Sequence, residues 1–186
     1  MKKQIWNRVI AAVLLAAMSG CGSRPKEETS APVAGNAALT PQNGYARGTS
    51  GDVMQTHWFT IVAEEASLTD AYADLTPAAE DRKLLVVPVT VTNTCDTDLS
   101  MYDVDFQVQW DDDSENAFTM PLTVEDAARF RDGMLEDSYV LAVNETRSGD
   151  LVFEVPADAS GFAMVYQEVF ETGETGDIFI ITLTIK

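Results

Sequence analysis

A run of nine residues near the middle of the chain alternates strictly between apolar and polar side chains. Its apolar members lie two residues apart: Tyr102, Val104, Phe106, Val108 and Trp110. Aspartate and glutamine occupy the positions between them. Because successive side chains of a β-strand point to opposite faces, this period predicts a half-buried strand. Phe106 is expected to face the core and Asp105 to face solvent.

Five further segments have the composition of strands, with branched and aromatic residues bounded by turn residues. They are residues 58–62, 84–92, 151–155, 161–170 and 178–185. In the second of them, alternate positions are again apolar, which gives that strand one face for the core. Pro88 stands on its other face and has no N–H to donate, so it predicts an edge strand or a bulge there.

One short helix is expected between the strands. Thr123 is placed to cap it, Asp126 follows three residues later, and Gly133 is placed to stop it, so the helix spans about residues 124–131. Several short strands separated by turns predict an all-β fold, a two-sheet antiparallel sandwich with this helix inserted. A small open barrel is the alternative.

The N-terminus has the three parts of a bacterial lipoprotein export signal. Lys2, Lys3 and Arg8 make its start basic, the apolar run 9–18 follows, and small residues precede Cys21. The apolar run is shorter than the roughly 20 residues of a transmembrane span. We therefore expect cleavage before Cys21 and a diacylglyceryl group on its thiol, whose two acyl chains anchor the protein to the membrane. Secretion without lipid is the alternative.

Three regions follow from this signal. Residues 1–20 are expected to be the signal peptide, residues 21–50 the lipidated cysteine with a flexible linker, and residues 51–186 the folded domain. The linker shows no apolar period, so it cannot bury enough surface to offset its chain entropy. As a flexible coil it spans about 30 Å, which holds the domain away from the membrane. A domain of this length buries an adequate hydrophobic core without needing disulfides to stabilise it.

Acidic side chains dominate the charge. The chain has 12 Lys and Arg against 30 Asp and Glu, a formal net charge of −18 at pH 7. Such a surface repels phosphate backbones, which excludes nucleic acid as a partner. It also disfavours lying flat on an anionic membrane. Basic proteins and neutral glycans are the partners that it favours, and we expect an envelope or secreted protein. The oligomeric state stays open.

Few residues suit catalysis or zinc binding. His57 is the single histidine, and Cys95 is the single cysteine left when Cys21 carries lipid, so no zinc set forms within the chain. No Gly-x-Ser-x-Gly turn and no glycine-rich phosphate loop follow a strand. We expect no enzymatic activity, no cofactor and no metal, and a structural role for His57. Cys95 is expected to be a half-buried small residue, with a reactive thiol or an intermolecular disulfide as the alternative.

The acidic run from Asp111 to Glu115 places carboxylates at alternate positions, as calcium loops do. Asn116 stands where such a loop needs a sharply turning glycine, and Leu122 stands where it needs a bidentate glutamate. The EF-hand interpretation is therefore excluded. A solvated turn between two strands is the expectation, and a weak, irregular calcium site is the alternative.

Three segments occur in an order that covers nearly all of residues 51–186. They are V-P-V-T-V-T-N-T at 87–94, M-Y-D-V-D-F at 101–106, and N-E-T-R-S-G-D-L-V-F-E-V-P at 144–156. In this order they resemble the immunoglobulin-like domain-of-unknown-function lipoproteins of Gram-positive gut bacteria. The resemblance implies an immunoglobulin-like sandwich outside the cytoplasm, on the outer face of the cytoplasmic membrane in a Gram-positive cell. It carries no catalytic residues.

These observations together favour a lipid-anchored cell-surface lipoprotein with a non-catalytic binding or structural module. Two alternatives from other functional classes stay open. One is a small envelope-associated enzyme or an accessory subunit of an enzyme, which needs a deep cleft with carboxylates of raised pKa. The other is an envelope-protective lipoprotein of the chaperone-like or immunity type. A binding module instead needs an exposed apolar or aromatic patch.

Overall fold

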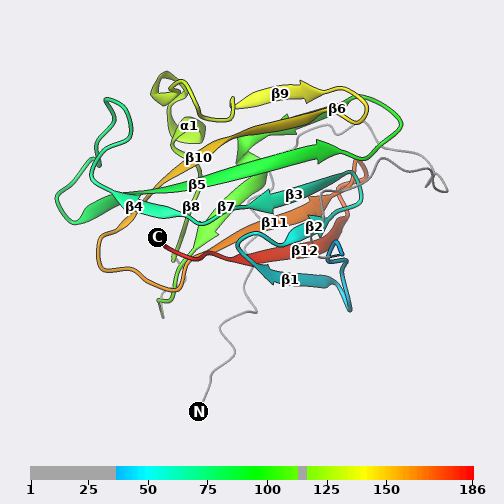
Figure 1. The fold of residues 1–186 in the computed structure, drawn as a ribbon, viewed down its shortest axis with the longest axis horizontal. Helices are drawn as coiled ribbons and strands as arrows, with labels where there is room; N and C mark the ends of the chain where they lie inside the picture. The colour runs from blue at the N-terminus through cyan, green and yellow to red at the C-terminus, as the bar shows by residue number, and fades with distance from the viewer. Residues whose placement is uncertain (1–36, 113–116) are drawn as a thin grey trace, which may run out of the picture.

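Two β-sheets packed face to face form the body of the protein in a computed structural model that describes residues 37–112 and 117–186 (Figure 1). We name the first the β12 sheet; its strand order is β1-β12-β11-β7-β8. Its strands are β1 (Tyr45–Thr49), β12 (Thr175–Thr182), β11 (Ala163–Val169), β7 (Phe106–Gln109) and β8 (Phe118–Thr119).

The second sheet, named the β5 sheet, has the order β10-β5-β3-β2, and β4 also pairs with β5. Its strands are β10 (Thr146–Pro156), β5 (Arg82–Asn93), β3 (Phe59–Ala63), β2 (Val53–Gln55) and β4 (Ser67–Thr69). The predicted all-β sandwich is therefore confirmed, and four of its predicted strands correspond to β3, β5, β10 and β11. The fifth, predicted over residues 178–185, corresponds to β12, which begins three residues earlier and ends at Thr182.

The fold begins before the boundary predicted at residue 51. β1 pairs with β12 in parallel, with Tyr45 opposite Ile178, and the backbone N–H of Leu39 donates to the carbonyl oxygen of Val53 at 2.7 Å. Part of the predicted linker therefore belongs to the sandwich. Within β1 only Ala46 is buried, so its sequence has too little apolar period to distinguish it from a linker.

The core lies between the two sheets and is centred on aromatic rings from both. Phe59 of the β5 sheet and Tyr166 of the β12 sheet have ring centroids 5.0 Å apart, and Phe106 lies 5.7 Å from Tyr166. The predicted inner face of β5 is confirmed, because all four of its members are buried: Leu85, Val87, Val89 and Val91. The inward-facing residues Met164 and Tyr166 of β11 are likewise buried.

Pro88 lies in a central strand, so the expected edge position is wrong. β5 is paired with β10 along its whole length, and Pro88 is opposite Asp150. On the other side of β5, β3 pairs only from Val89 onward and β4 only as far as Val86. The Pro88 carbonyl oxygen accepts from Glu64 on that side at 2.9 Å. Its nitrogen points the same way, into the gap between β3 and β4, where no ladder hydrogen bond is lost.

The predicted continuous strand over residues 102–110 is broken in two. β6 (Leu99–Tyr102) pairs with β9 (Ser138–Leu141) as a separate two-stranded ribbon, and β7 joins the β12 sheet. A 3₁₀ turn, η1 (Asp103–Asp105), connects them. The turn changes the phase of the alternation, so Asp105 does not face solvent as expected.

The expected helix over residues 124–131 is also broken in two. α1 (Leu122–Glu125) is followed by Asp126, whose backbone is extended at φ −151°, and then by η2 (Ala127–Arg129). Pro121, not Thr123, precedes α1, while the Asp126 carboxylate accepts from the Ala128 N–H at 2.9 Å. Within residues 37–112 and 117–186, no helix has the length and hydropathy of a membrane span.

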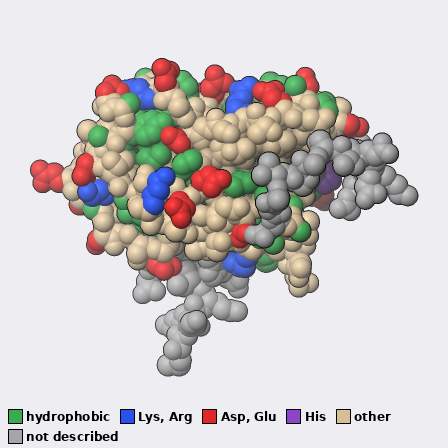
Figure 2. Space-filling view, viewed as in Figure 1, with side chains coloured by type: hydrophobic (Ala, Val, Ile, Leu, Met, Phe, Trp, Pro, Cys, Tyr) green, Lys and Arg blue, Asp and Glu red, His purple; other side chains and the backbone are tan. Residues whose placement is uncertain are grey.

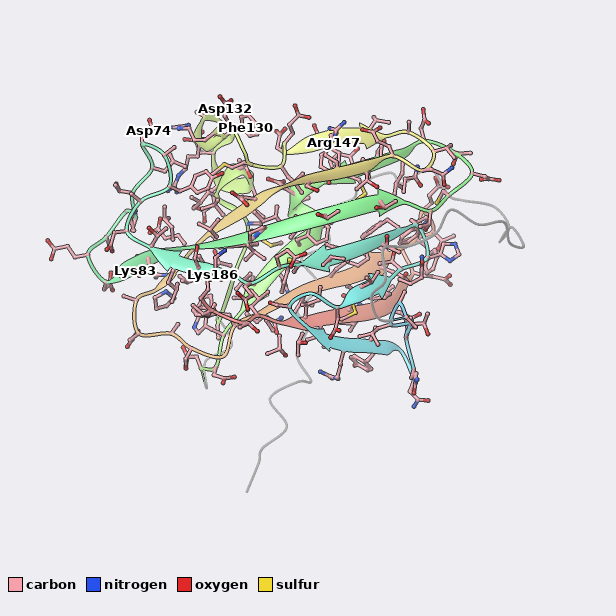
Figure 3. The ribbon with its side chains drawn as sticks, in the orientation of Figure 1. Asp74, Lys83, Phe130, Asp132, Arg147 and Lys186 are labelled. Carbon is pink, nitrogen blue, oxygen red and sulfur yellow. The ribbon has the colours of Figure 1, made fainter. Side chains whose placement is uncertain are left out.

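This helical segment covers the outer face of the β5 sheet. A second apolar cluster forms there from sheet residues and from the loops above them: Leu84, Val86, Val152, Leu75, Leu122 and Met134. The Tyr72 hydroxyl fixes the loop before β5 by donating to Asp150 at 2.9 Å, and Arg131 pairs with Asp74. Asp74, Phe130 and Asp132 lie together at this end of the molecule (Figure 3).

Candidate functional site

The lipid-attachment residue predicted from the sequence, Cys21, lies outside the described residues. The same is true of residues 113–116, most of the acidic run weighed for calcium. Of the described part of that run, Asp111 donates its backbone N–H to the Ser160 carbonyl oxygen at 2.8 Å. In the described part of the chain, no group of three or more His, Cys, Asp or Glu side chains is placed to hold a metal.

His57 is an exposed residue whose ring contacts two aromatic side chains. Its ring packs edge-on against Trp58 and Phe170, with centroids 5.2 and 5.7 Å away. Its backbone N–H donates to the buried carboxylate of Glu168 at 2.7 Å, and the Asp177 N–H donates to the same carboxylate at 3.1 Å. Burial raises the pKa of Glu168, and the two N–H groups oppose that shift. Glu168 thereby ties the start of β3 to β11 and β12.

Cys95 is buried beside Trp58 in the main core, deeper than the half-buried position expected. Its backbone N–H donates to the side-chain oxygen of Asn93 at 2.8 Å. The sulfur of Cys95 is disulfide-bonded and no free cysteine occurs among the described residues, which argues against the alternative of a reactive thiol. We assign no thiol chemistry to it.

The ribbon of β6 and β9 has one face in the core and one face in solvent. Leu99, Met101, Tyr139 and Leu141 are buried, and the residues between them point outward. The outward residues, with one from the following turn, make up what we call the β6–β9 face: Ser100, Tyr102, Ser138, Val140 and Val143. Val140 exposes 55% and Val143 43% of its surface. A binding module needs an exposed apolar patch, and Val140 and Val143 are exposed apolar side chains of this region.

Charged side chains surround the β6–β9 face. Arg147 of β10 lies beside β9, where its guanidinium covers the Tyr139 ring at 4.8 Å and pairs with Glu136 and Glu145 at 3.3 and 3.1 Å (Figure 3). The neighbouring Asp137 is exposed. In the space-filling view, Asp and Glu side chains spread along the upper rim, where β9 lies, with Lys and Arg between them (Figure 2). The rim therefore presents mainly carboxylates to a partner.

Two carboxyl groups lie beneath the ribbon, where η1 leads into β7. Asp103 is buried and accepts a hydrogen bond from the Thr123 hydroxyl. Burial raises the pKa of Asp103. Burial also raises the pKa of Asp105 to about 7; a hydrogen bond from the Tyr102 backbone lowers it, and the charge of Asp103 raises it further. Near neutral pH, Asp105 therefore exchanges between the protonated and the ionised form.

A carboxyl group of raised pKa is also what the enzyme alternative needs, but the surroundings of Asp105 differ from a catalytic cleft. Its closest titratable neighbours are Asp103 and the phenols of Tyr139 and Tyr166, all three in buried residues. Burial raises the pKa of both phenols above its ordinary value, and the charge of Asp105 adds to the rise. The arrangement is suited to holding a proton inside the fold.

The β6–β9 face and the buried carboxyls both escaped the sequence interpretation. Each depends on the pairing of β6 with β9, in which Ser100 lies opposite Val140. The residues of β9, Ser-Tyr-Val-Leu, carry an alternating pattern too short to be recognised by itself. The one local signal for the buried carboxyls was the pair Asp103 and Asp105 on either side of an apolar residue, and the alternating pattern assigned both aspartates to the solvent face.

Comparisons with known proteins identify the domain. The sequence profile of "Domain of unknown function (DUF4352)" matches residues 49–178. Among solved structures, the ycdA protein of Bacillus subtilis, a "putative lipoprotein", is similar with a TM-score of 0.51 and 16% identity over 70% of this chain and 38% of that one. The yjhA protein of the same species has a TM-score of 0.51 and 14% identity over 73% and 99%.

A third structure is an "uncharacterized beta-sandwich protein" of Clostridium difficile 630, with a TM-score of 0.41 and 11% identity over 87% of this chain and 100% of that one. The present chain spans less than half the length of ycdA. No curated protein matches the chain. At identities this low, the similarity to ycdA and yjhA shows the shared fold.

Proposed function

This chain belongs to the family of the domain of unknown function DUF4352, and from that premise we propose that it is a lipid-anchored lipoprotein whose sandwich is a non-catalytic binding module outside the cytoplasm. We place it among the lipoproteins of Gram-positive gut bacteria, on the outer face of the cytoplasmic membrane. The export signal that ends at Cys21 supports this location. The Bacillus subtilis structure of the same fold, itself a "putative lipoprotein", is in accord with it.

The anchor can be tested at the N-terminus of the mature protein. We expect mass spectrometry of protein extracted from membranes to show a chain that begins at Cys21 with a diacylglyceryl group. Cys21→Ser is expected to release the protein from membranes or to leave the precursor uncut. Because the chain has only two cysteines, lipid on Cys21 excludes an intrachain disulfide at Cys95, where the structure carries a disulfide, so the mass spectrum decides between the two. An unlipidated Cys21 joined to Cys95 contradicts the proposal.

The observation that carries the binding role is the β6–β9 face. Val140 of β9 and Val143 of the turn after it are both exposed, and the exposed carboxylates of Glu136 and Asp137 precede them in the chain. An apolar centre with a charged rim is the usual anatomy of a protein interface. We assign to this face an envelope or secreted protein with a basic surface around an apolar contact. The acidic rim speeds such an encounter and repels acidic competitors.

Binding through this face predicts different behaviour for two exposed valines. Val140 lies on the β6–β9 face, while Val169, with 39% exposure, ends β11 elsewhere on the molecule. A photo-crosslinking residue at position 140 of the full chain, expressed in intact cells, is expected to capture the partner, and the same residue at position 169 is not. In a separate pull-down with the full chain and no photo-crosslinking residue, Val140→Asp is expected to weaken capture of the partner about tenfold or more, and Val169→Asp is expected to leave it unchanged.

Salt dependence separates this partner from other ligands. Capture is expected to fall between about 0.05 M and about 0.5 M salt, because screening weakens a contact between opposite charges. Equal capture at the two positions, or capture insensitive to both variants, contradicts the role of the face. Reproducible hydrolysis of a glycan, peptide or ester that one carboxylate substitution abolishes supports the enzyme alternative instead.

A further inference from the structure

Three buried polar atoms under the β6–β9 ribbon have no hydrogen-bond partner within the described part of the chain. They are Oδ2 of Asp105 and the hydroxyl oxygens of Tyr139 and Tyr166. The two tyrosines expose only 7% and 3% of their surfaces. Leaving a buried donor or acceptor unpaired costs most of its hydration free energy, so such groups in native proteins are bonded to protein or to ordered water.

The three groups come from three elements that border the main core. Asp105 ends η1 and precedes Phe106, whose Cα is paired with that of Tyr166 across the β7–β11 ladder. Tyr139 enters from β9, and its side chain belongs to the same core cluster as that of Tyr166. The charge of Asp105 acts on both hydroxyl groups. One carboxyl oxygen and two hydroxyl groups are therefore buried without a partner in the same region, with the carboxyl group acting on both phenols.

We propose that Asp105, Tyr139 and Tyr166 form an internal binding site for an ordered water molecule. The phenol O–H groups of Tyr139 and Tyr166 donate to the water oxygen, and the water donates one hydrogen to Oδ2 of Asp105. Three hydrogen bonds are the usual number for a buried water. The backbone of Tyr102 bonds to the Asp105 carboxyl group as well, which leaves Oδ2 for the water.

Water fits this site better than a cation does. A calcium ion takes about six to eight oxygen ligands, several of them charged, and the site offers one carboxylate oxygen and two phenols. The nearest other carboxyl group, that of Asp103, is already bonded to the Thr123 hydroxyl. Further charges face the two rings from outside the site: Arg147 and Glu136 act on Tyr139, and Glu168 acts on Tyr166.

A crystal structure of the full chain that resolves ordered water tests the site directly. We expect one density peak within about 2.6–3.2 Å of the three oxygens. In solution, the long-lived water is expected to give nuclear Overhauser signals to the ring protons of Tyr139 and Tyr166. Tyr166→Phe removes one donor and is expected to weaken or abolish the signal at Tyr139. Tyr45→Phe, a variant at an exposed ring on β1, is expected to leave both signals unchanged.

Tyr139→Phe is the reciprocal variant and supplies the test if Tyr166→Phe does not fold. Direct Tyr–Asp105 hydrogen bonds with no water between them overturn the proposal. So does a peak with anomalous scattering, which identifies a metal ion, or a water signal that neither tyrosine variant changes. None of these outcomes bears on the lipid anchor or on the β6–β9 face, so this inference and the proposed function fail separately.

Discussion

The aromatic ring of Phe106 is enclosed by other rings in the centre of the sandwich. It is 1% exposed and lies 6.4 Å from the Phe59 centroid and 5.7 Å from the Tyr166 centroid. Phe106→Ala leaves a cavity between two sheets that cannot close over it. We expect a loss of about 3–5 kcal/mol in the free energy of unfolding, measured by denaturant titration of the full chain.

Gln107→Ala is the matched control, because the neighbouring side chain is half-buried and points away from the core. Its effect is expected to stay within about 0.5 kcal/mol. Equal losses for the two variants contradict the assigned faces. Asp105 is unsuited as this control: the sequence pattern placed it in solvent, but its Oδ2 atom is buried without a partner.

At the scale of elements, sequence patterns predicted those strands that carry long runs of branched residues. β5, β10 and β12 each carry an unbroken run of buried apolar residues, so hydrophobicity alone locates them. β1 and β9 are short and half-exposed, and their positions depend on partners that are distant in sequence. The same dependence hid the candidate site, since no local pattern reveals that β9 pairs with β6. Among the functional residues, only Cys21 was predicted from the sequence alone, because the export signal is recognised by its residue types without knowledge of the fold.

The breaks at η1 and after α1 have a common cause. In each, an aspartate interrupts an otherwise periodic segment by bonding to a nearby group, a tendency that favours turns over continued strand or helix. The Asp103 carboxyl group accepts from the backbone N–H groups of Asp103 and Val104, and Asp126 accepts from the Ala128 N–H. The bond between Asp103 and Thr123 also joins the two breaks. Such competition between a side chain and the backbone is not resolved by counting apolar positions.

The gap between β3 and β4 gives a prediction for β5. Because the Pro88 nitrogen faces that gap, Pro88→Ala restores an N–H where no ladder acceptor stands, and we expect a change of less than about 1 kcal/mol in the free energy of unfolding. Val89→Pro, one residue on, alters a buried position paired with both Gly149 and Ala63. We expect it to cost about 3 kcal/mol or more. Similar stabilities for the two variants contradict this geometry.

At the scale of the whole molecule, the excess of carboxylates acts in two ways. Exposed carboxylates favour the basic partner that we propose, while mutual repulsion among them destabilises the compact state. Buried carboxyls act through their protonation. The structure raises the pKa values of three of them by burial: Asp103, Asp105 and Glu168. The contribution of these carboxyl groups to the free energy of unfolding therefore depends on pH.

The last prediction follows from Asp105, whose pKa rises from 3.8 to about 7. The folded state holds this proton more tightly than the unfolded state, so the stability it contributes is complete below about pH 4 and is lost as pH rises through 7. Denaturant titrations are expected to show the full chain more stable at pH 5 than at pH 8, by roughly 2–4 kcal/mol from this group. Asp105→Asn, which mimics the neutral acid, is expected to remove most of that difference. Asp158→Asn, at an exposed position, is expected to preserve it, and a wild-type stability that increases toward pH 8 contradicts the prediction.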